Sequence, residues 1–197
     1  MNLNLINFII TGIAFLFIAT AVIIDFIEYH SNNNTKKQKR SFVETGTMTL
    51  FFILFYLAIR FSIGKIAIFE STLFWIISFI CWMVIILGVY FNTIGRIYLG
   101  KNWANQIKIY KNHTLVTYGV YSIVRHPLYA SLIWIFYACS ILYLNWFAFL
   151  LNTLIFVPMM YHRAKQEESL LTKQFKNYKA YKNKVGMFFP KLKWSKK

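Results

Sequence analysis

The chain has 197 residues, of which 58% are hydrophobic and only 14% are charged. A soluble domain carries about 25% charged residues, so this composition excludes an ordinary soluble globular protein, and the length leaves no room for a second module. Lysine and arginine number 22 against six acidic residues, for a formal net charge of +16. Because the chain also has long apolar runs, we interpret this positive charge as an indicator of which loops lie on the cytoplasmic side and contact lipid head groups. We expect no nucleic-acid partner.

Three apolar runs in the first half of the chain predict three membrane helices. The run 5–24 is uncharged and, at about 30 Å, long enough to cross a bilayer. The second run covers 45–59 and the third covers 71–91. The first run lacks a preceding basic segment and is longer than the core of a secretory signal, so we expect it to be retained as a helix.

Residues 92–126 alternate basic and amide side chains with apolar ones, which is typical of a segment that lies along the membrane interface. The run 127–161 contains no charged residue. As one helix it would be about 50 Å long, too long for a hydrocarbon core of about 30 Å. We therefore predict a hairpin of two short helices that turns near Tyr143, Leu144 and Asn145. After the hairpin the chain becomes polar, which predicts a helix that leaves the membrane.

The basic residues are distributed as five membrane crossings require. Segment 28–44 contains four lysines and arginines, segment 92–126 contains five, and segment 161–197 contains eleven. With the amino terminus outside, five crossings place all three segments on the cytoplasmic side. The sequence therefore predicts an all-α, polytopic membrane protein with about five transmembrane helices and a carboxy-terminal helical hairpin.

Two polar clusters flank the uncharged hairpin, one from Asn105 to Tyr129 and the other from Tyr161 to Leu170. A hairpin returns the chain to the side on which it began, so both clusters should meet at one cytoplasmic pocket and form one site. We expect a single domain over residues 1–197. Within it, 1–91 supplies three membrane helices and 92–197 is the cofactor-binding and catalytic half.

The downstream cluster contains the only two acidic residues of the second half, Glu167 and Glu168. Arg163 and Glu167 share a helix face, whereas Glu168 lies about 100° around the helix. A solvated surface ion pair is one interpretation. A functional site is the other, because ionisable groups beside a membrane helix are costly. Carboxylates there can accept hydrogen bonds from a ribose or an amine, and an arginine can hold a carboxylate through two parallel bonds.

The upstream cluster contains a histidine and two tyrosines of interest. His126 precedes Pro127, which suits the first turn of a helix, so a structural role for the histidine competes with a catalytic one. Gly119 predicts a turn, and Tyr121 and Tyr129 each offer a flat apolar face with a polar tip. Such rings can sandwich an adenine, although tyrosines are also common at bilayer interfaces.

Other familiar sites have no support in the sequence. It contains no Gly-rich phosphate loop and no histidine–cysteine spacing of a zinc site, and we expect no metal. Cys81 and Cys139 lie inside apolar runs, where small buried side chains are favoured over a disulfide or a metal pair.

Several motifs of the second half resemble the isoprenylcysteine carboxyl methyltransferase family, within the wider group that includes phospholipid methyltransferases. They are LGKNW at 99–103, HTLV at 113–116, GVYSIVRHPLY at 119–129, the pair Glu167–Glu168, and the tail residues Phe175, Tyr178, Tyr181, Val185 and Pro190. Each motif alone is weak, but their order on both sides of the hairpin is specific. Ser131 and Lys176 depart from the family pattern, which commonly has glycine at both positions.

The resemblance implies a helical membrane enzyme with a cytoplasmic pocket for S-adenosylmethionine. By resemblance, the residues that contact the cofactor would be Gln106, His113, Thr114, Leu115, Val116, Tyr121, His126, Pro127, Leu128, Tyr129 and Glu167. Arg163 would orient the carboxylate of the substrate, and Glu167 and Glu168 would complete the catalytic group.

We therefore expect methyl transfer to a lipid-linked acceptor, with carboxyl O-methylation of an isoprenylcysteine-like small molecule or peptide as the leading prediction. A phosphatidylethanolamine-type N-methyltransferase is an alternative, and it would need a base to remove an ammonium proton. An NADPH-dependent membrane reductase is another, because some sterol reductases have a similar arginine–histidine–proline stretch. A non-enzymatic scaffold with a lipid-binding basic tail is the third. The Lys/Asn/Ile-rich composition favours a prokaryotic cell membrane, and the oligomeric state stays open.

Overall fold

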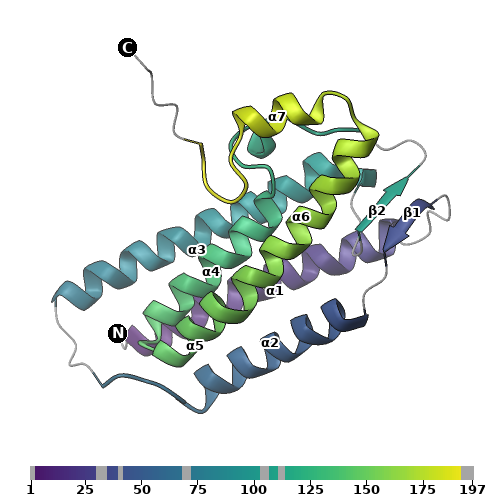
Figure 1. The fold of residues 1–197 in the computed structure, drawn as a ribbon. Coiled ribbons are helices and arrows are strands. Elements are labelled where there is room, and N and C mark those ends of the chain that lie inside the picture. The colour runs from purple at the N-terminus through teal and green to yellow at the C-terminus, as the bar shows by residue number, and fades with distance from the viewer. Residues whose placement is uncertain are drawn as a thin grey trace.

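Helices make up most of the molecule, as the sequence predicts (Figure 1). The computed structural model describes residues 3–29, 35–39, 42–67, 72–102, 107–110 and 114–191. The helices are α1 (Leu3–Tyr29), α2 (Phe42–Arg60), α3 (Thr72–Leu99), α4 (Pro127–Leu142), α5 (Trp146–Leu151), α6 (Val157–Gln174) and α7 (Tyr178–Lys184). 3-10 turns cover Gly100–Asn102 and Gly119–Ser122, and a π-helical turn covers Asn152–Phe156. This π-helical turn joins α5 to α6, so the three elements form one continuous rod.

Two short strands add a ribbon to the helices. β1 (Thr35–Lys39) and β2 (Ile107–Tyr110) pair antiparallel, with Lys37 opposite Ile109. The sequence predicts helices alone, because strands this short leave little periodic signal. The ribbon lies at the same end of the molecule as α7 (Figure 1).

α3 is longer than its apolar run. The sequence predicts that this helix ends near Phe91 and that residues 92–126 lie along the membrane interface. The helix instead continues to Leu99. The prediction of an interfacial segment is therefore wrong for residues 92–99, which form the last two turns of α3. Asn92 and Arg96 are buried there and form hydrogen bonds with neighbouring helices, which allows polar side chains to remain inside the bundle.

Two helical stretches are long and apolar enough to cross a membrane, Leu3–Asp25 and Thr72–Leu99. Only 22% of the apolar window in each is buried, so most of their apolar side chains face outward. The core helix of a soluble protein is mostly buried, whereas a broad exposed apolar surface indicates contact with lipid or a partner. Shorter apolar helices cover Gly46–Arg60 and Pro127–Leu142. This pattern is that of a bundle embedded in lipid.

The long helices run between two ends of the molecule, with the N-terminus at one end and α7 at the other (Figure 1). The hairpin turns where it is predicted. α4 ends at Leu142, and Leu144 adopts a φ of 49°. Asn145 then caps α5, because its side chain accepts a hydrogen bond from the Ala148 amide at 2.8 Å. The hairpin thus returns the chain to the end that carries α7, where the two polar clusters meet.

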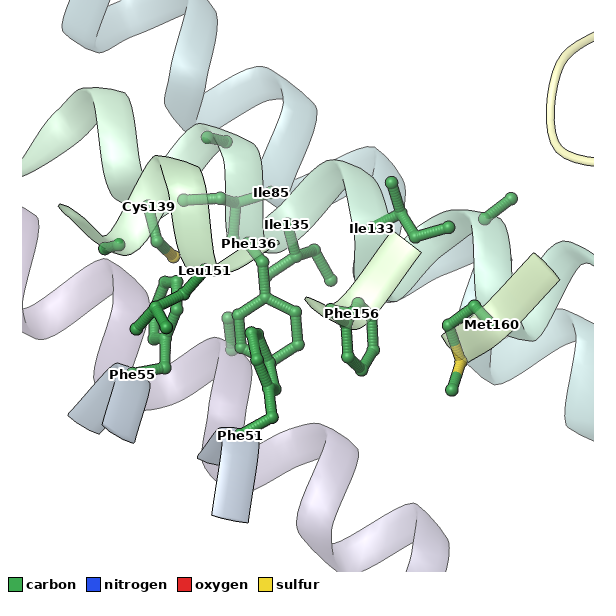
Figure 2. Packing of buried hydrophobic residues seen from close by; sticks show 14 of the residues in the cluster. Phe51, Phe55, Ile85, Ile133, Ile135, Phe136, Cys139, Leu151, Phe156 and Met160 are labelled. Carbon is green, nitrogen blue, oxygen red and sulfur yellow. The ribbon is translucent and has the colours of Figure 1, made fainter. Parts of the chain in front are cut away.

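An aromatic cluster fills the middle of the bundle (Figure 2). Phe136 on α4 packs against Phe51 and Phe55 of α2, with ring centroids 5.1 and 4.8 Å apart. Phe156, before α6, packs against Phe136 at 5.0 Å and stacks on Phe51 at 4.6 Å. These contacts hold α2 and the α5–α6 rod against α4.

α3 and α4 approach closely through small side chains. A Cβ atom on Gly88 would lie 2.6 Å from the Ile135 side chain, so only glycine fits without rearrangement. Ser131 is fully buried, and its hydroxyl accepts a hydrogen bond from Asn92 at 2.9 Å and donates one to the Leu128 carbonyl at 2.9 Å. Small residues and hydrogen bonds between helices are the usual means of packing in lipid.

Candidate active site

A cavity of about 470 Å³ lies among α1, α2, α3, α4, α6 and α7. Its polar wall includes Thr114, Tyr121, His126, Tyr129, Arg163 and Glu167. Its apolar wall includes Phe15, Val22, Met48, Phe52, Leu132 and Phe136. The volume is that of a small-molecule site, and the two kinds of wall suit ligands with both polar and apolar parts.

Most of the predicted site residues line this cavity. They are Thr114, Leu115, Val116, Tyr121, His126, Pro127, Leu128, Tyr129, Arg163 and Glu167. Gln106 and His113 lie outside the described residues. Glu168 is described, but it does not belong to the cavity wall.

α6 presents Arg163 and Glu167 to the cavity from consecutive turns of one face. The Arg163 guanidinium carbon lies 5.8 Å from the centre of the Tyr129 ring, and Nη1 donates a hydrogen bond to Met48 Sδ at 3.2 Å. The Tyr129 hydroxyl in turn donates a hydrogen bond to Glu167 Oε1. A cation, a phenol and a carboxylate therefore form one side of the polar wall.

His126 lies between two carboxylates instead of capping α4. Its side chain makes no cap hydrogen bond. Nδ1 lies 3.4 Å from Glu167 Oε2, and Nε2 lies 3.4 Å from Glu168 Oε1. The imidazole ring stacks on Tyr129, with centroids 5.6 Å apart and planes inclined by 6°. The imidazole therefore helps to fix the position of the Glu167 carboxylate at the cavity wall.

These groups hold one another in their charged forms. Burial alone would lower the pKa of His126, but hydrogen bonds with Glu167 and Glu168 outweigh this effect and raise it. Burial alone would raise the pKa of Glu167, but hydrogen bonds from His126 and Tyr129 outweigh this effect and lower it. Glu167 is thus ionised near neutral pH and can accept hydrogen bonds at the cavity wall.

The Glu168 side chain contacts Arg125, and Lys182 of α7, instead of the cavity. Its Oε1 accepts a hydrogen bond from Arg125 Nε at 2.8 Å, and its Oε2 lies 2.7 Å from Lys182 Nζ. Burial would raise the pKa of Glu168, but hydrogen bonds with His126, Lys182 and Arg125 outweigh burial and lower it to about 2. Glu168 therefore fastens α7 to α6, and it is not placed to touch a ligand in the cavity.

α7 and the residues after it form a cover over the polar wall. Val124 and Gly186 form a parallel bridge, and the Arg125 amide donates a hydrogen bond to the Gly186 carbonyl at 2.8 Å. The Arg125 side chain donates to two further carbonyls at the end of α7. The Tyr181 hydroxyl donates to the Tyr121 carbonyl at 2.6 Å. These bonds attach the cover to the segment that precedes α4.

Asn102, in the turn after α3, holds the segment that begins at Thr114. Asn102 Nδ2 donates to Thr114 Oγ1 at 2.9 Å, and Asn102 Oδ1 accepts from the Thr114 amide at 3.1 Å. The Tyr121 hydroxyl donates to the Gly95 carbonyl of α3 at 3.3 Å. Both sets of bonds attach this segment to the end of α3, where it lines the cavity.

A polar network crosses the bundle beside the cavity. Arg96, which lines the cavity, donates from Nη1 to Asp25 on α1 and from Nε to Asn92 at 2.9 Å. Asn92 in turn donates to Ser131 on α4. The Arg96 and Asp25 side chains are only 10% and 9% exposed. The network therefore joins α1, α3 and α4 through buried hydrogen bonds.

The sequence-based prediction missed several residues that build the site: Asp25, Arg96, Asn102, Arg125, Tyr178 and Tyr181. Asp25 could have been found from the sequence, because it is an acidic residue at the end of an apolar run. Such a residue is costly in a membrane unless it is paired. Asn102 and Arg125 stood inside the motifs quoted above. Their local sequence does not indicate which carbonyl or carboxylate they bind.

Comparisons with known proteins agree with this architecture. The model of the isoprenylcysteine carboxyl methyltransferase (ICMT) family matches residues 77–173. The protein-S-isoprenylcysteine O-methyltransferase of Saccharomyces cerevisiae is 33% identical over 111 residues, which cover 55% of this chain and 46% of the yeast protein. The probable protein-S-isoprenylcysteine O-methyltransferase of Oryza sativa subsp. japonica is 27% identical over 121 residues, covering 59% of this chain and 63% of the rice protein. The chain thus spans less than two thirds of the length of either relative.

A solved structure shows the same fold. It is that of the eukaryotic intramembrane Ras methyltransferase ICMT without a monobody, with a TM-score of 0.62 and 24% sequence identity. The match covers 93% of this chain and 67% of that one. At this level of identity, the likeness establishes the arrangement of the helices.

The fold and the cavity together define a helical integral membrane protein with an amphipathic pocket among its helices. The stretch matched by the family model supplies His126, Arg163 and Glu167, which meet at the polar wall of that pocket. Residues 77–173 resemble the isoprenylcysteine carboxyl methyltransferase family. The resemblance noted in its sequence motifs is confirmed.

Proposed function

We propose that the protein transfers a methyl group from S-adenosylmethionine to the carboxylate of an isoprenylcysteine-like lipid. The observation that carries the proposal is the pairing of Arg163 with Glu167 on one face of α6, inside a cavity that is polar on one side and apolar on the other. A water-soluble cofactor needs the polar side and a lipid acceptor needs the apolar side, and the two must lie next to each other for the reaction.

The side chains of the polar wall are of the kinds that could bind S-adenosylmethionine. Glu167 is ionised and can accept hydrogen bonds from ribose hydroxyls, which are neutral donors. The stacked rings of His126 and Tyr129 and the nearby Tyr121 offer aromatic surface for an adenine. Thr114 adds a polar group held in place by Asn102. When bound, S-adenosylmethionine supplies a methyl group carried on a positively charged sulfur.

Arg163 is the residue we assign to the acceptor. Its guanidinium lies at the cavity wall beside Tyr129 and Met48, one helical turn from Glu167 and closer to the apolar side. A guanidinium can hold a carboxylate through two parallel hydrogen bonds, which fixes its direction. Such positioning supplies about 7–11 kcal/mol of barrier reduction in well-oriented reactions. A carboxylate is already ionised near neutral pH, so this assignment requires no general base.

The remaining residues keep this arrangement in place. Arg125, Glu168 and Lys182 hold α7 against α6, where Tyr178 and Tyr181 of α7 form part of the cavity wall. Charges attract one another more strongly in a partly buried cavity than in bulk water. Glu168, which the sequence places in the catalytic group, is assigned here to positioning.

We also propose that the chain crosses the membrane five times, with the cavity facing the cytoplasm of a prokaryotic cell. The support is that the segments after α1 and α3 and the basic α7 all lie at the end opposite to the N-terminus (Figure 1). The test is accessibility labelling of single cysteines after replacement of Cys81 and Cys139. Cysteines at Thr117 and Lys173 should react from the cytoplasmic side and one at Ser62 from the other. Labelling of Thr117 and Lys173 from opposite sides would exclude the proposed pocket.

Two variants separate binding of the acceptor from binding of the cofactor. Arg163→Ala should lower methyl transfer by about 10²-fold or more, since it removes a charged donor at the reacting group, while the calorimetric Kd for S-adenosylmethionine stays near that of the parent. Glu167→Ala should weaken cofactor binding itself. Lys173→Ala, an exposed cation on α6, is the matched control and should change neither. Normal cofactor affinity in the Glu167 variant would refute the role given to this carboxylate.

The product distinguishes a carboxylate acceptor from an amine. Membranes are incubated with methyl-labelled S-adenosylmethionine, and the labelled lipid is then treated with alkali. A methyl ester releases labelled methanol, and this is the expected result. Label that stays on the lipid as a methylamine would instead establish the N-methyltransferase, which requires a base to remove an ammonium proton.

A further inference from the structure

α7 has one face turned toward the cavity and another that is exposed. Tyr178, Tyr181 and Val185 are spaced three and four residues apart, so they share one face of the helix. Tyr178 is buried, and both tyrosines line the cavity. The remaining positions of α7 are exposed, apart from Lys182, which contacts Glu168. The helix therefore supplies cavity residues on one side and meets its surroundings on the other.

The exposed side of α7 is basic. It carries Lys179 and Lys184, and Lys176, just before the helix, is exposed as well. We call these three lysines the basic surface. The sequence has no acidic residue after Glu168, and the Glu168 carboxylate is already paired with Lys182. This stretch of chain therefore supplies no carboxylate that could neutralise the basic surface.

The segment after α7 places an exposed aromatic ring beside an apolar helix. The chain turns back from α7 toward the bundle (Figure 1). Phe189 is 66% exposed, and its ring packs against Trp134 of α4 with centroids 6.2 Å apart. Trp134 lies seven residues after Pro127, the first residue of α4, which corresponds to about 10 Å of helix. The segment thus reaches along an apolar helix of the bundle and leaves a phenyl ring on its outer surface.

The same segment contacts the polar wall of the cavity. Phe188 is buried and packs edge-on against the His126 ring, with centroids 6.3 Å apart. The Met187 carbonyl accepts a hydrogen bond from the His126 amide at 3.2 Å. His126 lines the cavity and lies beside Glu167. The position of Phe189 is therefore connected, through its two predecessors, with the position of the polar wall.

We propose that α7 and the residues up to Phe189 form an interfacial anchor whose partner is the anionic phospholipid of the surrounding bilayer. The basic surface binds the phosphates of anionic head groups, and Phe189 enters the boundary between head groups and acyl chains. Interfacial amphipathic segments combine lysines with aromatic side chains that reach about 5–10 Å into this boundary. Because α7 also supplies Tyr178 and Tyr181 to the cavity, anionic lipid strengthens ligand binding there. The proposal rests on the proposed function and deepens it, since it names a regulation of the same site.

The first test measures hydrogen exchange of the protein in lipid nanodiscs, made either of phosphatidylcholine alone or of equal amounts of phosphatidylcholine and phosphatidylglycerol. The α7 amides should exchange about tenfold more slowly in the anionic discs, since each lysine near an anionic surface favours the bound state by about fivefold. The triple variant Lys176→Gln/Lys179→Gln/Lys184→Gln should lose this difference. Lys65→Gln, an exposed position before the bridge to Asn145, is the matched control and should keep it. Equal exchange of the parent in both discs would overturn the proposal in favour of a soluble acidic partner.

The second test locates Phe189 relative to the bilayer. A bimane fluorophore is attached to the Phe189→Cys variant after replacement of Cys81 and Cys139. Lipids brominated on their acyl chains should quench its fluorescence, and aqueous iodide should have little effect. The same fluorophore on Asn183→Cys, an exposed position of α7, should respond to iodide instead. Quenching at position 189 by iodide alone would overturn the proposal.

The third test connects the anchor with the cavity. The calorimetric Kd for S-adenosylmethionine should be about fivefold lower in the anionic discs than in phosphatidylcholine discs, which is the contribution of about one lysine. The triple lysine variant should show the same Kd in both. An equal Kd for the parent in both discs would overturn the regulation. If S-adenosylmethionine binds in neither disc while exchange and quenching follow the expected pattern, the proposed function fails and the anchor stands.

Discussion

Asp25 of α1 and Arg96 of α3 form an ion pair buried inside the helical bundle, and this pair sets the position of one wall of the cavity. Asp25 follows Val22 by three residues and Ile18 by seven, so it lies on the face of α1 that lines the cavity. Fixing this carboxylate to α3 therefore fixes the rotation of α1. The same arginine reaches Asn92, which extends the connection to α4.

Replacing Asp25 by asparagine should destabilise the protein strongly. The change leaves Arg96 as a buried charge without its counter-ion, and loss of one partner of a buried ion pair costs about 3–5 kcal/mol. Thermal unfolding in detergent measures the effect, with Thr20→Ala on an exposed position of α1 as the control. The double variant Asp25→Asn/Arg96→Gln should lose less than the sum of the single variants. Strict additivity would show that the two side chains do not act as a pair.

Glu168→Gln should lower the stability of the cover at neutral pH. The pKa of Glu168 is lowered to about 2, so its ionised form stabilises the folded protein above its ordinary pKa, and this contribution is lost as pH falls through the range from about 4.5 to about 2. The difference in Tm between parent and variant should therefore be largest near neutrality and shrink on acidification. Ser169→Ala, an exposed neighbour on α6, should leave Tm unchanged. A difference that stays constant with pH would rule out this assignment.

His126 should show the opposite dependence on pH. Its pKa is raised in the folded protein, so protonation stabilises the fold fully below the ordinary histidine pKa of about 6.5, and this contribution is lost as pH rises through the folded value. The stability difference between parent and His126→Gln should therefore diminish in alkaline buffer. His162→Gln, at an exposed position on α6, provides the comparison. A difference that grows with pH would contradict the two-carboxylate arrangement.

Gly119→Ala should destabilise the turn before α4. Gly119 has a φ of +60°, and a Cβ atom there would overlap the Tyr98 ring. The left-handed conformation alone costs a non-glycine residue about 1–2 kcal/mol. Gly12→Ala is the control, because a Cβ on Gly12 meets nothing within 4 Å. Adding Tyr98→Ala should recover only the steric part of the loss in Tm, and full recovery would show that backbone conformation plays no role.

The hairpin and the meeting of the two polar clusters could be predicted from the sequence. An uncharged run too long for a single crossing had to turn, and its turn lies between Leu142 and Trp146. The same geometry brings His126 and Glu167 together. These features follow from length and charge, which are properties of single segments.

The contacts between distant segments could not be predicted in the same way. Asp25 and Arg96 are 71 residues apart, and nothing in either local pattern names the other. The role of Glu168 could not be predicted either. Glu167 and Glu168 have the same side chain, and only their directions on the helix differ, so that Glu167 lines the cavity and Glu168 contacts Lys182. The two strands of the ribbon were too short to leave a periodic signal.

The bonds from Arg125 to Gly186 and to the carbonyls that end α7 also bear on how the protein is made. The membrane helices and the apolar wall are synthesised first, and the segment that covers the polar wall is among the last described residues to leave the ribosome. During synthesis, the apolar wall of the cavity is therefore complete before α7 exists. The polar wall gains Tyr178 and Tyr181 only once α7 has folded against Arg125.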